Sequence, residues 1–147
     1  MTVTDELLAN AERYAAGFDE AGLASPPGKH LAIVACMDAR LNPYALLGLA
    51  AGDAHIIRNA GGVVTQDALR SLAISQRLLG TTEIVLLHHT GCGMLSFTDQ
   101  AFRDDIAADT GVRPTWESEA FTDLEGDVRE GMARIHAERA IPPRTSP

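Results

Sequence analysis

The sequence contains few cysteines and few aromatic residues. Two of its 147 residues are cysteines, Cys36 and Cys92, and aromatic residues make up 5%. Two cysteines can form at most one disulfide bond, which argues against the disulfide-rich scaffold of small secreted proteins. In a reducing compartment, two such thiols more often bind a metal or take part in catalysis. With so few aromatic side chains, Ala, Leu, Ile and Val must fill most of the core.

The chain also lacks an excess of positive charge and any long apolar run. It has 12 Lys and Arg residues against 20 Asp and Glu residues, a net charge of -8. Nucleic acid and anionic membrane surfaces are therefore not expected as partners, because both attract clustered basic residues. No apolar run approaches the roughly 20 residues of a membrane span, and the acidic start, MTVTDELLANAE, lacks a secretory signal. A cytoplasmic protein is expected.

The length fits one domain, residues 1–147, since domains usually contain about 100–200 residues. Near the start, the spacing of apolar residues predicts an amphipathic helix over 4–16, with Thr4 as its N-cap, inside an N-terminal arm over 1–25. At the other end, prolines and a polar composition predict a flexible tail over 141–147.

The middle of the chain alternates between strand and helix patterns. Short apolar runs predict strands at 31–36, 54–57 and 83–89. Residues 65–80 predict a helix that begins after Thr65 and ends at Gly80, and a further helix is expected over about 119–139. A strand–helix–strand order implies a right-handed parallel crossover. The fold class is therefore α/β, with a central, mostly parallel sheet flanked by helices.

Three residues that can bind a metal follow the predicted strands. Cys36 ends the first strand, His89 ends the strand at 83–89, and Cys92 comes three residues later. Ligands of open parallel sheets bind beyond the carboxyl ends of the strands, so we expect these side chains to converge. Two thiolates and one imidazole suit Zn²⁺, and three protein ligands leave a fourth position free, which is typical of a catalytic zinc.

Asp38 and Arg40 follow Cys36 at two-residue spacing, which in an extended chain places all three side chains on one side. Arg40 can hold the Asp38 carboxylate in a bidentate pair and keep it ionised. Asp38 can then orient a water molecule on zinc, or it can occupy the fourth zinc position itself and close the site. A histidine could carry the proton to solvent, and His55 and His88 are both candidates.

Simpler interpretations of these residues exist. Cys36 and Cys92 could form a redox-active dithiol pair that holds no metal. This alternative leaves Asp38, Arg40 and His89 without a role. Asp38 and Arg40 could also be an ordinary ion pair.

The pattern Cys36-x-Asp38-x-Arg40, followed by His89-x-x-Cys92-Gly93, closely resembles the β-class carbonic anhydrases. Residues 58–62, RNAGG, are similar to the Arg-Asn loop of that family, and the resemblance covers roughly residues 30–116. It implies that Cys36, His89 and Cys92 bind one Zn²⁺ per chain and that Asp38 and Arg40 form the active-site dyad.

The resemblance further implies reversible hydration of carbon dioxide to bicarbonate and a proton, with a hydroxide on zinc as the nucleophile. It implies a homodimer or higher oligomer, since the N-terminal helix of the family reaches over a partner subunit. One alternative is a hydrolase of carbon disulfide or carbonyl sulfide at the same site. Another is a non-catalytic zinc-binding protein in which Asp38 closes the site. Family members usually continue into a further edge strand, so a shortened C-terminal end is expected here.

Overall fold

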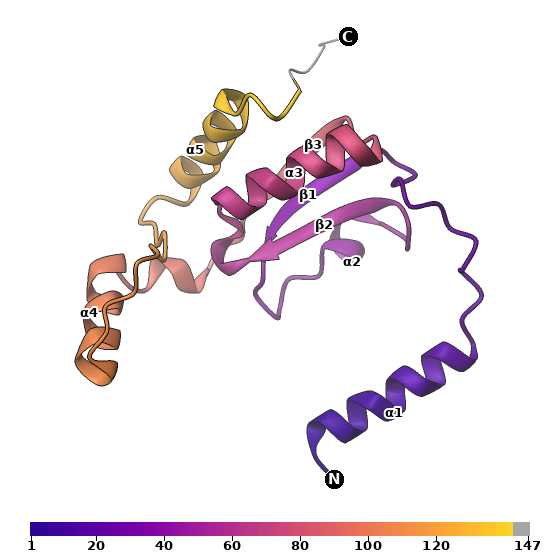
Figure 1. Cartoon of the computed structure of the whole chain (residues 1–147), viewed down its shortest axis with the longest axis horizontal. Helices are drawn as coiled ribbons and strands as arrows, with labels where there is room; N and C mark the ends of the chain where they lie inside the picture. Colours follow the sequence, from indigo (N-terminus) through magenta and orange to yellow (C-terminus); the bar gives the residue numbers. More distant parts are fainter. Residues whose placement is uncertain (143–147) are drawn as a thin grey trace.

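The computed structural model describes residues 1–142 and shows a three-stranded parallel sheet with helices packed against it (Figure 1). The strands are β1 (Leu31–Cys36), β2 (Ala54–Asn59) and β3 (Glu83–Leu87), in the order β2-β1-β3. Both pairings of β1 are parallel. The predicted α/β fold with a central parallel sheet is confirmed.

Strand β1 lies at the centre of the sheet, and its burial follows from that position. Residues 32–36 are all buried, and Ile33 and Val34 have no exposed surface. A strand with neighbours on both sides and cover on both faces needs a continuous apolar run, and LAIVAC supplies it. The last residue of the strand, Cys36, is therefore also buried.

Helix α3 (Gln66–Leu79) connects β2 to β3, as predicted. The side chain of Thr65 accepts a hydrogen bond from the N–H of Ala68, and Gly80 ends the helix with a left-handed φ of 75°. Leu69 and Leu72 face the sheet and belong to one apolar cluster with Ala32, Val34, Val64 and Ile141. This cluster is the core on one face of the sheet.

Helix α5 (Leu124–Ala137) packs beside the same core. A side chain at Gly131 would meet Val64 at 2.9 Å, so the absence of a Cβ permits close packing here. The helix is shorter than the predicted 119–139 because Asp123 caps its start by accepting a hydrogen bond from the N–H of Gly126.

Several predicted boundaries were wrong by a few residues. The first helix, α1 (Val3–Ala16), is capped by Thr2 rather than Thr4, because Thr2 and Asp5 exchange the two hydrogen bonds of a capping box. Strand β2 continues to Asn59, which pairs with Cys36. Strand β3 ends at Leu87, so His89 lies in the loop that follows.

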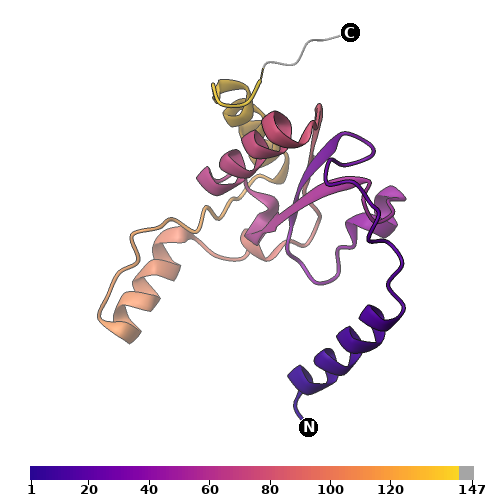
Figure 2. The ribbon, with the colours of Figure 1, turned by 45° about the vertical axis from the view of Figure 1, so that its right-hand side comes forward.

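Two helices were not predicted, α2 (Pro43–Leu47) and α4 (Asp99–Thr110). Helix α2 has only five residues, too few to show helical periodicity, and α4 buries none of its residues. Helices α1 and α4 both project from the body of the molecule in two views (Figures 1 and 2). The stability of α1 and α4 therefore depends on capping and local sequence more than on packing within the chain.

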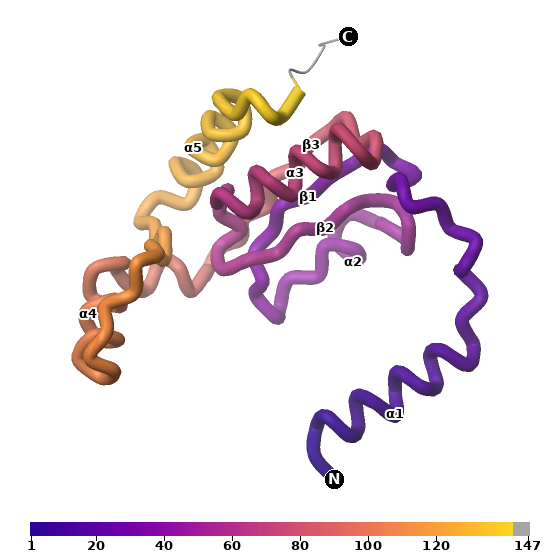
Figure 3. The backbone as a smooth tube through the Cα atoms, viewed as in Figure 1, coloured from indigo at the N-terminus to yellow at the C-terminus, as the bar shows by residue number. Residues whose placement is uncertain are grey.

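The two ends of the chain differ in their burial. Helix α1 has no buried residue and lies apart from the sheet (Figure 3). Ile141 is 6% exposed and packs in the core, so the prediction of a flexible tail was wrong for this residue. Residues 143–147 of that predicted tail lie outside the described residues. No helix within residues 1–142 is long and apolar enough to cross a membrane.

Candidate metal centre

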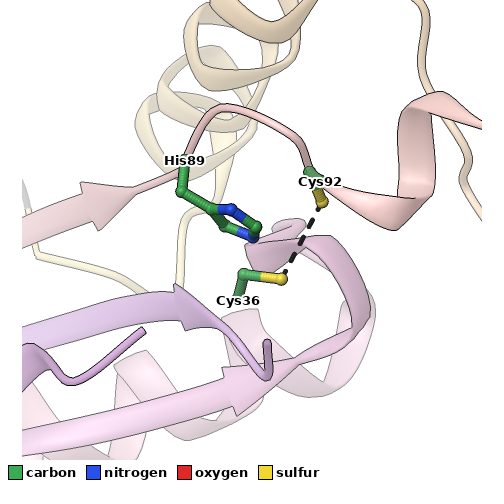
Figure 4. Close-up of side chains that lie close together, drawn as sticks. All are labelled: Cys36, His89 and Cys92. Atoms are coloured by element: carbon green, nitrogen blue, oxygen red, sulfur yellow. Dashed lines mark hydrogen bonds between the residues drawn. The ribbon is translucent and has the colours of Figure 1, made fainter. Parts of the chain in front are cut away.

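Cys36, His89 and Cys92 converge at the carboxyl end of the sheet, although 53 residues separate the first two (Figure 4). Cys36 is the last residue of β1, and the other two lie in the loop after β3. One donor atom from each side chain lies within 4.8 Å of the others. The parallel pairing of β1 with β3 brings these ends together, as expected from the sequence.

The imidazole of His89 is oriented to offer one nitrogen to a metal. Its Nδ1 lies 2.9 Å from the backbone oxygen of Thr90, which can only accept, so Nδ1 donates. Its Nε2 is buried and has no hydrogen-bond partner in the described residues. A ligating histidine is commonly held this way, with the second nitrogen donating to a carbonyl. The orphaned Nε2 therefore fits a metal ion.

The two thiols complete a donor set of sulfur and nitrogen. The Sγ atoms of Cys36 and Cys92 lie 3.9 Å apart, and both cysteines are buried. Burial opposes ionisation of Cys36, but the N–H groups of Asp38 and Gly61 and the nearby imidazole outweigh it, so its pKa is lowered. Burial keeps the pKa of Cys92 raised despite a hydrogen bond from the N–H of Met94. Such a donor set suits Zn²⁺.

Asp38 and Arg40 form a bidentate pair beside this group. Arg40 donates from Nε to Oδ1 at 2.9 Å and from Nη2 to Oδ2 at 2.7 Å. The backbone N–H of Arg40 also donates to Oδ1, at 2.8 Å. The side chain and N–H of Arg40 therefore hold the pKa of the Asp38 carboxyl well below its usual range.

The expectation of an extended chain from Cys36 to Arg40 was wrong. The chain turns at residues 39–40, because the carboxylate of Asp38 accepts the N–H two residues ahead. This local hydrogen bond is typical of aspartate at turns. The turn still places Asp38 at the group of donors, with Oδ2 3.7 Å from Nε2 of His89.

Arg40 also joins the two loops that carry the site. Its Nη2 lies 3.2 Å from the backbone oxygen of Gly91, between His89 and Cys92. The same guanidinium thus contacts the carboxylate after β1 and the loop after β3. The arrangement can hold a cation between its donors while an ionised carboxylate faces that position.

The segment 58–62, at the end of β2 and just after it, supports the site from the backbone. Gly62 has a φ of +66°, and a Cβ there would lie 2.9 Å from the backbone nitrogen of Cys36. The glycine is needed both for its backbone conformation and for this close approach. Arg58 belongs to the RNAGG segment noted in the sequence, but no role was predicted for it, and its Nε donates to the backbone oxygen of Cys36.

The two candidate proton carriers have other partners. His88 is 5% exposed and lies 2.7 Å from the carboxylate of Asp127. His55 pairs with Ala32 in the sheet register, four residues or roughly 13 Å along the strand from Cys36. Its Nδ1 contacts Ser75 at 2.7 Å. Neither histidine faces the donor group from an exposed position, so this geometry gives no support to either as the carrier.

Comparisons with known proteins agree on one family. The sequence model described as carbonic anhydrase matches residues 31–138. Beta-carbonic anhydrase 1 of Mycobacterium tuberculosis is 58% identical over 99% of this chain and 89% of that protein. A carbon disulfide hydrolase of an Acidianus species is 42% identical over 61% of this chain and 44% of that protein. The crystal structure of a carbonic anhydrase from Streptococcus mutans matches with a TM-score of 0.89 and 44% identity, covering 97% of this chain and 86% of that chain.

We predict that Arg40→Gln raises the pKa of the Asp38 carboxyl toward the ordinary range of aspartate, because it removes the guanidinium that stabilises the carboxylate. Carboxyl carbon shifts followed by NMR during an acid titration would measure this pKa. Since the folded-state pKa is depressed, the pair stabilises the protein above the ordinary aspartate pKa and loses this contribution on acidification. Arg70→Gln, on the exposed side of α3, is the control and should leave the Asp38 pKa unchanged. An unshifted pKa in Arg40→Gln would contradict the interpretation.

Proposed function

This chain belongs to the β-class carbonic anhydrase family and catalyses the reversible hydration of carbon dioxide to bicarbonate and a proton, and we propose that it does so with one zinc ion per chain held by Cys36, His89 and Cys92. The observation that carries the zinc proposal is the buried, unpartnered Nε2 of His89 beside two buried thiols. When bound there, Zn²⁺ supplies Lewis acidity that lowers the pKa of a water molecule toward neutrality.

Asp38 has the charge and place to orient the attacking water. Arg40 keeps its carboxylate ionised, so Oδ2 can only accept a hydrogen bond. By accepting one from the water, Asp38 directs the oxygen lone pair toward the carbon of carbon dioxide. The new C–O bond forms bicarbonate, and the proton leaves to solvent or buffer.

The alternative in which Asp38 permanently closes the site has less support. Arg40 engages both carboxylate oxygens through its side chain, and rotation of Asp38 onto the metal would break these bonds. We therefore propose that Asp38 stays paired with Arg40 during turnover.

The alternative substrates, carbon disulfide and carbonyl sulfide, also have less support. The Acidianus relative named as a carbon disulfide hydrolase aligns with 61% of this chain, whereas the mycobacterial carbonic anhydrase aligns with 99%. Carbon dioxide is therefore the substrate that we assign to the site.

We also propose that the protein is a homodimer or a larger oligomer. Leu7, Leu8 and Tyr14 of α1 are each more than half exposed, and the helix has no buried residue. An exposed apolar stripe on a well-capped helix is typical of an interaction surface. A second copy of the chain fits this surface, because the family resemblance implies an N-terminal helix that reaches over a partner subunit.

We further propose a reducing, cytoplasmic location, because Cys36 and Cys92 form no disulfide bond with each other.

We expect His89→Asn to lose zinc, because it removes one of three ligands. Metal analysis after dialysis against a chelator should find about one zinc per chain in the wild type and much less in the variant. The control is His30→Asn, since His30 has a left-handed φ of 54° that asparagine tolerates. Stoichiometric zinc in His89→Asn, with unchanged resistance to the chelator, would contradict the ligand set.

Asp38→Asn should slow carbon dioxide hydration by about tenfold or more while zinc stays at one per chain, because the attacking water loses its ionised acceptor. Stopped-flow measurements with a pH indicator over pH 6–9 would give the rate. Asp67→Asn changes an exposed carboxylate on α3 and serves as the control. If Asp38→Asn turns over like the wild type, the role assigned to Asp38 is wrong.

Leu8→Asp should convert the oligomer to monomers, because it places a charge in the apolar stripe of α1. Size-exclusion chromatography with light scattering would measure the mass of both proteins. Ala9→Asp adds the same charge about 100° or more around the helix from each of Leu7, Leu8 and Tyr14, and should keep the wild-type mass. A monomeric wild type would refute the proposed self-association.

A further inference from the structure

Arg58 lies beside the proposed active site but has no part in the function described so far. It is the fifth residue of β2 and pairs in register with Ala35, one residue before Cys36. Its side chain reaches across the end of β1 toward the segment that carries Asp38. This segment, residues 36–41, leaves the sheet at Cys36 and leads to helix α2.

The guanidinium of Arg58 donates to three backbone oxygens of segment 36–41. Nε donates to the oxygen of Cys36 at 3.0 Å, and Nη2 donates to the oxygens of Asp38 and Leu41, each at 2.9 Å. One side chain therefore contacts the start, middle and end of the segment. The three contacts come from two nitrogens of one planar guanidinium, whereas the three N–H donors of an ammonium group all start from a single nitrogen.

Beyond β1, the backbone of segment 36–41 makes one backbone–backbone hydrogen bond to another strand and one within the segment. The N–H of Met37 donates to the oxygen of Asn59 at 2.7 Å, and the N–H of Leu41 donates to the oxygen of Asp38 at 3.0 Å. Both the strand ladder and the following helix end outside the segment, because β1 stops at Cys36 and α2 begins at Pro43. Arg58 supplies donors where regular secondary structure does not.

The charge of Arg58 is not used in an ion pair within the described residues. The arginines paired with carboxylates there are Arg40, Arg70, Arg103, Arg113 and Arg134, and Arg58 is not among them. Arg40, two residues from Asp38, holds its carboxylate, whereas Arg58 holds the backbone beneath it. The two arginines therefore fix different parts of the same aspartate.

We propose that Arg58 is a positioning residue for carbon dioxide hydration. By fixing the carbonyls of residues 36, 38 and 41, it keeps the thiol of Cys36 and the carboxylate of Asp38 directed at the same point. A displacement of about 1 Å at a reacting group can cost a large part of the rate. This inference rests on the role proposed above for Asp38, and it assigns no contact between Arg58 and the substrate.

Two variants and one control test the inference in the zinc-loaded enzyme. Arg58→Met removes all side-chain donors, and Arg58→Lys keeps the charge but not the three-way contact. We expect kcat to fall about tenfold or more in both, with KM for carbon dioxide and the zinc content nearly unchanged. Arg70→Met, which removes an exposed arginine from α3, should leave kcat unchanged. Thermal melting would verify that each variant folds.

A double-mutant cycle with Asp38→Asn identifies the residue through which Arg58 acts. If Arg58 positions Asp38, Arg58→Met should lower kcat by less than about twofold in the Asp38→Asn background, because coupled residues are not additive. Independent, multiplicative losses would overturn the inference. If Arg58→Met does not fold, Arg58→Lys and its own cycle with Asp38→Asn give the same decision.

The remaining outcomes also separate the possibilities. Full activity in Arg58→Lys, or a change confined to KM for bicarbonate, would mean that the charge acts on the anion, which overturns a positioning role. Wild-type kcat in Arg58→Met beside a slow Asp38→Asn would contradict this inference alone. Wild-type kcat in Asp38→Asn would contradict the proposed role of Asp38 and this inference with it.

Discussion

The hydrogen-bonded parallel pairing of β1 with β3 is the constraint on which the active site depends. It sets Ala35 opposite Leu87, so the residues that follow each strand meet at the same edge of the sheet. The donor atoms of Cys36, His89 and Cys92 then lie within 4.8 Å of one another. Cys36 and Cys92 pack with Met94 in an apolar cluster separate from the core that β1 forms with α3. A shift of either strand by one residue would reverse the direction of its side chains and separate the donors.

The polar contacts around these donors hold both side chains and backbone groups in place. Arg40 engages the carboxylate of Asp38 and the oxygen of Gly91, which joins the loops after β1 and β3. Arg58 engages carbonyls of the first loop from the neighbouring strand β2. The loop after β3 fixes the imidazole of His89 through the oxygen of Thr90. Asp38 and His89 are thus each oriented by a hydrogen-bond partner.

Much of the site could be predicted from local sequence, and the errors have local causes. The strand at 31–36 and the cap at Thr65 were predicted correctly, since a continuous apolar run and an N-cap are both encoded by adjacent residues. The extended path from Cys36 to Arg40 was wrong because the side chain of Asp38 accepts the N–H of Arg40 and turns the chain. Helix α4 was missed because it buries no residue, so the periodicity of apolar residues is weak.

By itself, the sequence determined the fold class and identified Cys36, His89 and Cys92 as candidate metal ligands, since apolar periodicity and residue type are properties of the chain alone. The tertiary structure decided which nitrogen of His89 is left unpartnered and which carboxylate oxygens Arg40 holds. It also decided that Arg58 joins β2 to the loop after β1. These contacts connect residues up to about 50 positions apart, and only the folded sheet fixes the distances between them.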